Sequence, residues 1–143
     1  MPHRLVRSII EHQNLLTASP ETTVSEAAGL MKRSQVGAII VVERGRLAGI
    51  FTERDALFRV LAEGRDPQAT RLADVMTRDP QTIAPDKPLG HALHMMYEGR
   101  FRHVPVVENG KPLGIVSARD ALGPELLEFE AELVNRDHIR EIL

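Results

Sequence analysis

The chain contains one seven-residue stretch twice, and this duplication limits its possible folds more than any other feature. The first copy runs from Gly49 to Asp55 and the second from Gly114 to Asp120, 65 positions later. With no gap, about a third of the positions from 17 to 57 are identical to their partners in the second copy. Because half of a 143-residue chain would bury too little surface to be stable alone, the sequence predicts one compact domain built from two repeats.

Both copies predict the same order of elements. A short extended segment ends at Pro20 or Pro85, a helix with apolar residues at i, i+3, i+4 and i+7 follows, and two strands rich in β-branched residues come next. Asn109-Gly110 between the last two strands is a strong hairpin signal. The strands are almost continuously apolar, which favours a sheet covered on both faces. Pro105 predicts a sheet edge or a backbone that faces a ligand.

These patterns divide the chain into four parts. We assign residues 4–64 to the first repeat, 65–71 to a linker, 72–123 to the second repeat and 124–143 to an additional C-terminal helix. The helix after the first motif should place Leu57, Val60 and Leu61 on one face and end at Gly64. The last helix should align the apolar residues Leu126, Phe129 and Leu133.

Each motif places a hydroxyl three residues before a carboxylate, at the start of a predicted helix. The pairs are Thr52 with Asp55 and Ser117 with Asp120. By spacing alone this is a capping box, which stabilises a helix start. The free backbone amides of a helix start also suit an anionic or polar ligand. Capping and ligand contact are compatible, and both interpretations stay open from the residues alone.

With these two motifs and the run from Leu72 to Thr77, the chain resembles a tandem pair of CBS domains, often called a Bateman module, over roughly residues 4–122. The resemblance implies an α+β fold in which two CBS repeats, each a short β-sheet with helices, pack about a pseudo-twofold axis. It also implies two clefts that take adenosyl ligands such as AMP, ADP, ATP or S-adenosylmethionine.

The resemblance further implies roles for particular residues. Asp55 and Asp120 would accept hydrogen bonds from ribose hydroxyls, because a carboxylate accepts well from a vicinal diol. Thr52 and Ser117 would contact ribose or phosphate, and the extended segments would line the adenine pocket. The predicted nucleotide-binding residues are Thr17, Ala18, Thr52, Arg54, Asp55, Thr82, Ile83, Arg102, His103, Pro105, Ser117, Arg119 and Asp120.

The two clefts are not expected to be equivalent. Arg102-His103 stands where the first copy has Gly37-Ala38, so only the second copy offers a basic pair to phosphate. Solvated surface charge is the alternative interpretation of this pair. Glu53 beside the first motif would oppose an anion, and protonation of His103 would favour AMP below about pH 6.5.

Other functions find little support in the sequence. A net charge of −2 and 3% aromatic residues argue against nucleic-acid binding, and no apolar run is long enough for a membrane span. Zero cysteines fit a reducing compartment, and we expect the cytoplasm. His91, His94 and Glu98 share a helical face, but a solvated surface explains them better than a metal site. Without a nucleophile elbow or a phosphate loop, we expect no enzyme and no cofactor.

The leading hypothesis is therefore a regulatory module that senses an adenosyl ligand, forms a homodimer and acts on a protein partner. An interaction scaffold with empty clefts is the main alternative. An enzyme with an unrecognised site is a third possibility.

Overall fold

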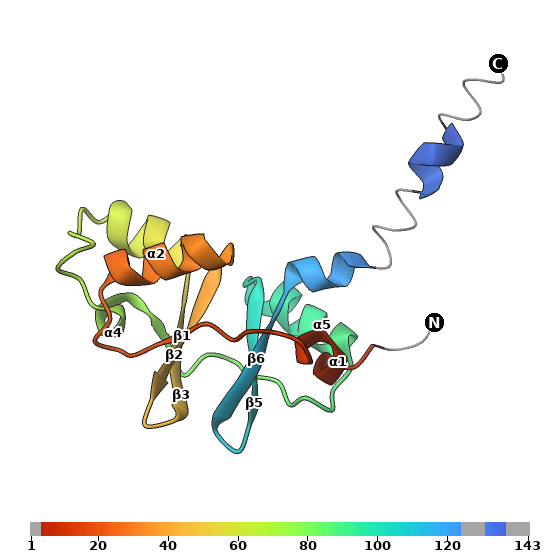
Figure 1. Ribbon diagram of the computed structural model, residues 1–143, viewed down its shortest axis with the longest axis horizontal. Coiled ribbons are helices and arrows are strands. Elements are labelled where there is room, and N and C mark those ends of the chain that lie inside the picture. Colours follow the sequence, from red (N-terminus) through yellow and green to blue (C-terminus); the bar gives the residue numbers. More distant parts are fainter. Residues whose placement is uncertain (1–3, 124–130, 137–143) are drawn as a thin grey trace.

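The computed structural model describes residues 4–123 and 131–136, and within them two β-hairpins lie side by side with helices outside (Figure 1). The first repeat contains β1 (Thr17–Ala18), α2 (Val24–Ser34), β2 (Ala38–Glu43), β3 (Arg46–Thr52), α3 (Glu53–Asp55) and the π-helix η1 (Ala56–Leu61). The second contains α5 (Leu89–Gly99), β5 (His103–Glu108), β6 (Lys111–Ser117) and the 3-10 helix η2 (Ala118–Ala121). Helix α1 (Val6–Ile10) opens the first repeat, and α4 (Leu72–Val75) and β4 (Thr77–Arg78) open the second. The predicted α+β class is confirmed.

Local sequence signals explain how these elements start and turn. The Thr23 hydroxyl accepts a hydrogen bond from the Glu26 amide at 3.2 Å and caps α2. Asn109 and Gly110 have φ values of 55° and 79°, which is the left-handed backbone that a tight hairpin turn requires. Arg44 and Gly45 form the matching turn of the first hairpin.

The two repeats differ in how many strands pair. In the first, β1 runs parallel to β2, while β2 with β3 and β3 with β4 are antiparallel, in the order β1-β2-β3-β4. In the second, β5 and β6 pair alone, and Ile83 adds one isolated bridge to β5. Pro105 gives the physical reason why the counterpart of β1 is reduced to one bridge: the matching Ile40 donates its amide to the Leu16 carbonyl at 3.2 Å, and proline has no such donor. Its place on β5, a strand with one full neighbour, fits the predicted edge.

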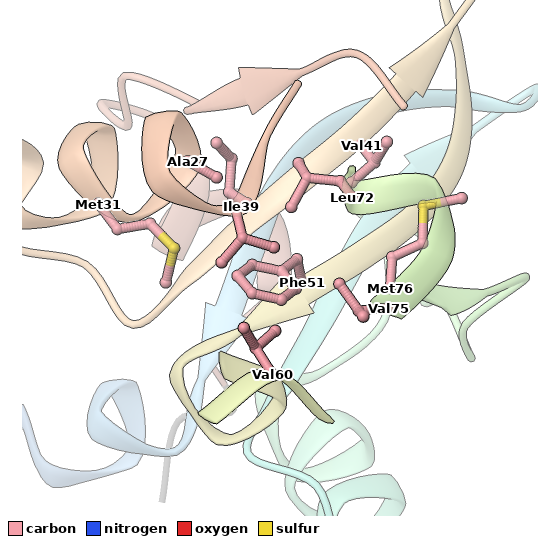
Figure 2. Packing of buried hydrophobic residues seen from close by; sticks show 10 residues of the cluster. Ala27, Met31, Ile39, Val41, Phe51, Val60, Leu72, Val75 and Met76 are labelled. Carbon is pink, nitrogen blue, oxygen red and sulfur yellow. The ribbon is translucent and has the colours of Figure 1, made fainter. Parts of the chain in front are cut away.

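The hydrophobic core of each repeat is completed by the segment that opens the other repeat. Leu72, Val75 and Met76, from α4 and the residue after it, pack around Phe51 in the first core, as Figure 2 shows. Val6 from α1 is fully buried in the second core. The boundaries at residues 4 and 72 therefore mark where the sequence repeat begins. They do not mark the packed units, because α1 packs in the second core and α4 packs in the first.

A third apolar cluster joins the two hairpins. Ala38, Ile40 and Ile50 of β2 and β3 are buried, and Ile115 of β6 packs against them. The Leu47 amide also donates to the Gly110 carbonyl at 3.0 Å, close to the two hairpin turns. The hairpins are thus fixed to each other along their lengths and not only through the connecting chain.

Three sequence expectations need comment. The predicted linker 65–71 is folded against α2, because the Thr70 carbonyl accepts from the Val24 amide at 2.8 Å and Thr70 is 6% exposed. Leu57, Val60 and Leu61, expected on one apolar face, are not buried together: Val60 is buried, but Leu57 and Leu61 are 49% and 72% exposed. The wide turn of a π-helix changes the angular spacing of side chains on which that expectation rested. Residues 131–136 are helical and Leu133 is exposed, whereas the expectations for Leu126 and Phe129 lie outside the described residues.

The approach of β4 to β3 predicts that two identical substitutions act in opposite directions. A Cβ atom at Gly49 would lie 2.6 Å from the Thr77 carbonyl oxygen, so Gly49→Ala should lower the free energy of unfolding by about 1–3 kcal/mol. Gly90 lies in α5 with nothing within 4 Å, so Gly90→Ala should raise it by up to about 1 kcal/mol. Urea denaturation of both variants measures the difference. Equal stabilities would contradict the close approach.

Candidate ligand-binding site

A cavity of about 1170 Å³ lies between the two repeats. Its first wall contains residues 13–16, the C-terminal half of α2 and the loop after it, the start of β2, and parts of β3, α3 and η1. Its second wall contains the start of β5, Ile115 and the second motif on β6 and η2. Five predicted site residues line it: Arg102, His103, Ser117, Arg119 and Asp120.

The second motif reaches this cavity as a capping box. Asp120 Oδ2 accepts from the Ser117 amide at 2.7 Å and from the Ser117 hydroxyl at 3.3 Å. Arg4 donates to the Asp120 backbone carbonyl at 2.7 Å, so the N-terminal segment also holds η2 in place. The capping interpretation is therefore confirmed at Asp120, and it occupies one of the two carboxylate oxygens.

The first motif forms the same box. Asp55 Oδ2 accepts from the Thr52 amide at 2.9 Å, and the Thr52 hydroxyl accepts from the Asp55 amide at 3.2 Å. Neither residue lines the cavity, although Glu53 between them does. The first repeat therefore contributes a carboxylate to the cavity that contains the second motif.

Charges of both signs surround the cavity. Lys32, Arg102 and Arg119 are basic, and Glu53 and Asp120 are acidic. Asp120 is half-buried, whereas the other four are exposed at the mouth. The arrangement could hold an anionic group at the basic side while a polar group meets Asp120.

Sequence reasoning missed Lys32 and Gln13 as wall residues. The Gln13 side-chain amide donates to the Ile115 carbonyl at 2.7 Å and accepts from the Ile115 amide at 3.0 Å, so it pairs with β6 as a strand backbone would. No motif marks either residue, because their roles depend on segments that are far apart in the sequence.

The other predicted site residues lie elsewhere. Thr17, Ala18, Thr52, Arg54, Asp55, Thr82, Ile83 and Pro105 are not among the residues that line this cavity. Ile83 is 4% exposed within the second core, and Arg54 lies over the Phe58 ring, 5.6 Å from its centre. Leu15 and Leu16, just before the expected Thr17, line the cavity instead. The roles assigned to these eight residues stay predictions.

His103 is the titratable group of the cavity whose pKa the surroundings change. Burial lowers the pKa of His103 below its usual 6.5, and the nearby Arg102 lowers it further. Glu53 and Asp120 act in the opposite direction, because a carboxylate favours the imidazolium, but burial has the larger effect. The imidazole is therefore neutral at pH 7, and any gain in AMP affinity from its protonation moves below the pH 6.5 expected from the sequence.

Protonation of His103 should also make the fold pH-dependent. Because its pKa is lower in the folded chain than in the unfolded one, the unfolded chain takes up a proton first as pH falls below about 6.5. Stability from the neutral imidazole should be present above that pH and lost as pH falls toward the folded-state pKa. Urea denaturation at pH 7.5 and 5.5 should show a smaller drop for His103→Gln than for the wild type, since both share the other titrating groups. The same drop in both proteins would contradict the effect of burial.

Two alternatives can be compared with the described part of the chain. Within residues 4–123 and 131–136, no three His, Asp or Glu side chains are placed to hold a metal ion. His94 Nε2 lies 3.2 Å from Glu98 Oε1, and both side chains are exposed, as expected for a solvated helix face. No helix in the same residues is long and apolar enough to cross a membrane.

Two similar units that exchange segments and border a shared cavity define a tandem-repeat α+β module. The sequence profile of the CBS domain matches residues 6–62 and 72–123, so the chain belongs to the CBS-domain family, with two domains in tandem. Tandem CBS domains are regulatory modules that commonly bind ligands.

Relatives with the same domains occur in bacteria and plants. CBS domain-containing protein YhcV of Bacillus subtilis is 41% identical over 104 residues, which are 73% of this chain and 74% of that protein. The mitochondrial CBS domain-containing protein CBSX3 of Arabidopsis thaliana is 34% identical over 123 residues, 82% of this chain and 60% of the relative. This chain therefore spans only about three fifths of the plant protein's length.

Solved structures show the same fold. A protein with CBS domains from Burkholderia ambifaria has a TM-score of 0.80 and 30% identity, covering 86% of this chain and 94% of that one. The hexameric CBS-CP12 protein from bloom-forming cyanobacteria has a TM-score of 0.77 and 28% identity, covering 86% of this chain and 68% of that one.

Proposed function

We propose that this chain is a regulatory module that binds an adenosyl ligand, AMP, ADP, ATP or S-adenosylmethionine, in the cavity between its two CBS domains. The observation that carries the proposal is the joint placement of the capped Asp120 and the basic Arg102 on one cavity wall. The volume of about 1170 Å³ exceeds the roughly 300–1,000 Å³ of most ligand pockets, so a nucleotide has room.

Asp120 would recognise the ribose. The cap uses Oδ2, and no hydrogen bond from the described residues reaches the other oxygen, Oδ1. A half-buried carboxylate with one oxygen facing a cavity accepts strongly from the two hydroxyls of a vicinal diol. The cap thus orients the group that would bind the ligand.

The base and the phosphate would lie on different surfaces. Leu15, Leu16 and Ile40 give the cavity an apolar wall of the kind that accepts a planar base. Arg102 and Lys32 supply cations at the mouth, where an arginine binds phosphate oxygens through two donors. A neutral adenosyl ligand would lack this second contact, so AMP is favoured over adenosine.

Occupancy would act through the position of the two domains. The walls come from both repeats, so a ligand in the cavity contacts both and favours the arrangement that fits it. A protein partner that prefers that arrangement would then sense the ligand. We propose no chemical conversion and no cofactor for this module, which acts by binding, and we place it in the cytoplasm.

A homodimer completes the proposal. Leu57, Phe58 and Leu61 along η1 are 49%, 54% and 72% exposed, and such neighbouring apolar side chains favour a protein contact. The cyanobacterial CBS-CP12 structure is hexameric, so a chain of this fold assembles with copies of itself. A second copy of this chain is the proposed occupant of the η1 face.

AMP binding tests the proposed function directly. AMP should raise the melting temperature, because a ligand that binds only the folded chain stabilises it. Asp120→Ala should weaken both AMP and adenosine by about 1.5–3 kcal/mol, roughly ten- to a hundred-fold in Kd, because both carry the ribose. Arg102→Ala should weaken AMP more than adenosine. Calorimetric titration of AMP and adenosine into the wild type and both variants measures these affinities.

Arg65→Ala is the matched control, because it removes an exposed positive charge that does not line the cavity. It should leave the ratio of AMP to adenosine affinity unchanged. If AMP, ADP, ATP and S-adenosylmethionine all fail to bind or to shift melting, the ligand-sensing proposal is wrong and the scaffold alternative remains.

Self-association has its own test. Leu61→Glu places a charge on the exposed η1 face and should convert dimers to monomers, whereas the exposed Tyr97→Glu on α5 should not. Light scattering during gel filtration gives the mass of each. A wild-type monomer at tens of micromolar, or a dimer that Leu61→Glu leaves intact, would contradict a dimer through η1.

A further inference from the structure

We propose that the chain binds a single nucleotide, at the second motif, because its own Arg59 takes the place of a ligand at the first. This inference rests on the proposed function and deepens it. It concerns the two motifs that the sequence makes nearly identical and that the structure places in different surroundings.

The comparison starts from an equal geometry. In both motifs the helix cap binds carboxylate oxygen Oδ2, through the Thr52 amide at 2.9 Å and the Ser117 amide at 2.7 Å. In both, the motif hydroxyl also donates to Oδ2, at 3.1 Å and 3.3 Å. The cap therefore leaves Oδ1 as the oxygen that differs between the repeats.

In the first repeat Oδ1 already has a cation. Arg59 Nε lies 3.5 Å from Asp55 Oδ1, one helical turn further on, in the acid-before-base order that favours such pairs. Nη1 of the same guanidinium donates to the carbonyls of Val75 and Met76, at 3.1 Å each. Three acceptors thus hold Arg59, and the Asp55 side chain is only 13% exposed. A ribose diol would have to displace a cation that is also bonded to the end of α4.

The described residues of the second repeat contain no equivalent of Arg59. The position 65 residues after Arg59 is Pro124, which has neither charge nor side-chain donor. Within the described residues no Lys, Arg or His pairs with the Asp120 carboxylate, and Asp120 lines the cavity. Among the described residues, the oxygen that Arg59 occupies in one repeat therefore has no paired cation in the other.

The contacts at the sheet edge beside each motif also leave more room at the second motif than at the first. In the first repeat the backbone of β4 pairs directly with β3, at Gly49 and Ile50. In the second, the Gln13 side chain makes the bonds to Ile115, so the crossing backbone stands further from β6 by the length of a side chain. This spacing contributes to the cavity, since Gln13, Ile115 and Asp120 all line it.

Calorimetric titration of AMP into the full chain tests the inference. The wild type should bind one equivalent per chain. Asp120→Asn should lose at least about ten-fold in affinity, whereas Asp55→Asn should stay within about two-fold, because Arg59 already occupies Asp55. Arg59→Gln should admit a second, weaker equivalent, and adding Asp55→Asn should remove it again. Arg59→Lys, which keeps the positive charge, is the matched control and should bind one equivalent of AMP per chain.

Each result has a definite meaning. For Asp55→Asn and the Arg59 variants, a first equivalent bound with wild-type affinity shows that the variant is folded. Two equivalents in the wild type, or equal losses from Asp55→Asn and Asp120→Asn, would overturn the single-site inference while leaving nucleotide binding intact. An Arg59→Gln protein that stays at one equivalent would overturn the role of Arg59. A wild type that binds no AMP, ADP, ATP or S-adenosylmethionine would overturn the proposed function, and this inference with it.

Discussion

The structure depends on the exchange of two apolar segments between its repeats. Val6, near the start of the first repeat, is fully buried in the second core. Leu72, at the start of the second repeat, is fully buried in the first core. Burying such a side chain stabilises a fold by about 1.5–3 kcal/mol, so neither repeat has a complete core without the segment that starts the other. The exchange fixes the two hairpins side by side, and with them the cavity between the repeats.

The helix caps connect stability with binding. From the sequence alone, the motif carboxylates could serve a helix start or a ligand. The structure confirms the caps and shows that each cap needs only one oxygen of its carboxylate. The fate of the second oxygen is decided by residues outside the motif, so two motifs of the same sequence pattern need not have the same function.

The duplication, the hairpin turns and the main helices could be predicted because they follow from local patterns: apolar spacing, Asn109-Gly110 and the Thr23 cap. The exchange of segments could not, since an apolar stretch shows that it will be buried but not in which core. Arg59 stands four residues after Asp55 in the sequence, but its importance comes from the Val75 and Met76 carbonyls, which only the fold brings to it. Most of the cavity wall was missed for the same reason: residues such as Gln13 and Lys32 are distant from either motif in the sequence.

Divergence between the repeats also changes where charged side chains stand. Glu53 and Ala118 occupy matching positions, and each donates its amide to a matching carbonyl, of Gly37 and of Arg102, at 2.9 Å. The backbone geometry is therefore the same, but the charged residue differs. The first repeat has the acidic Glu53 over Gly37, and the second has the basic Arg102 beside Ala118. A Cβ atom at Gly37 would lie 3.0 Å from the Glu53 carboxylate, so the glycine makes room for the acid. Glu53 lies on the first wall of the one cavity and Arg102 on the second, so these two positions carry opposite charges across it, beside Lys32 and Asp120, which carry the other sign on each wall.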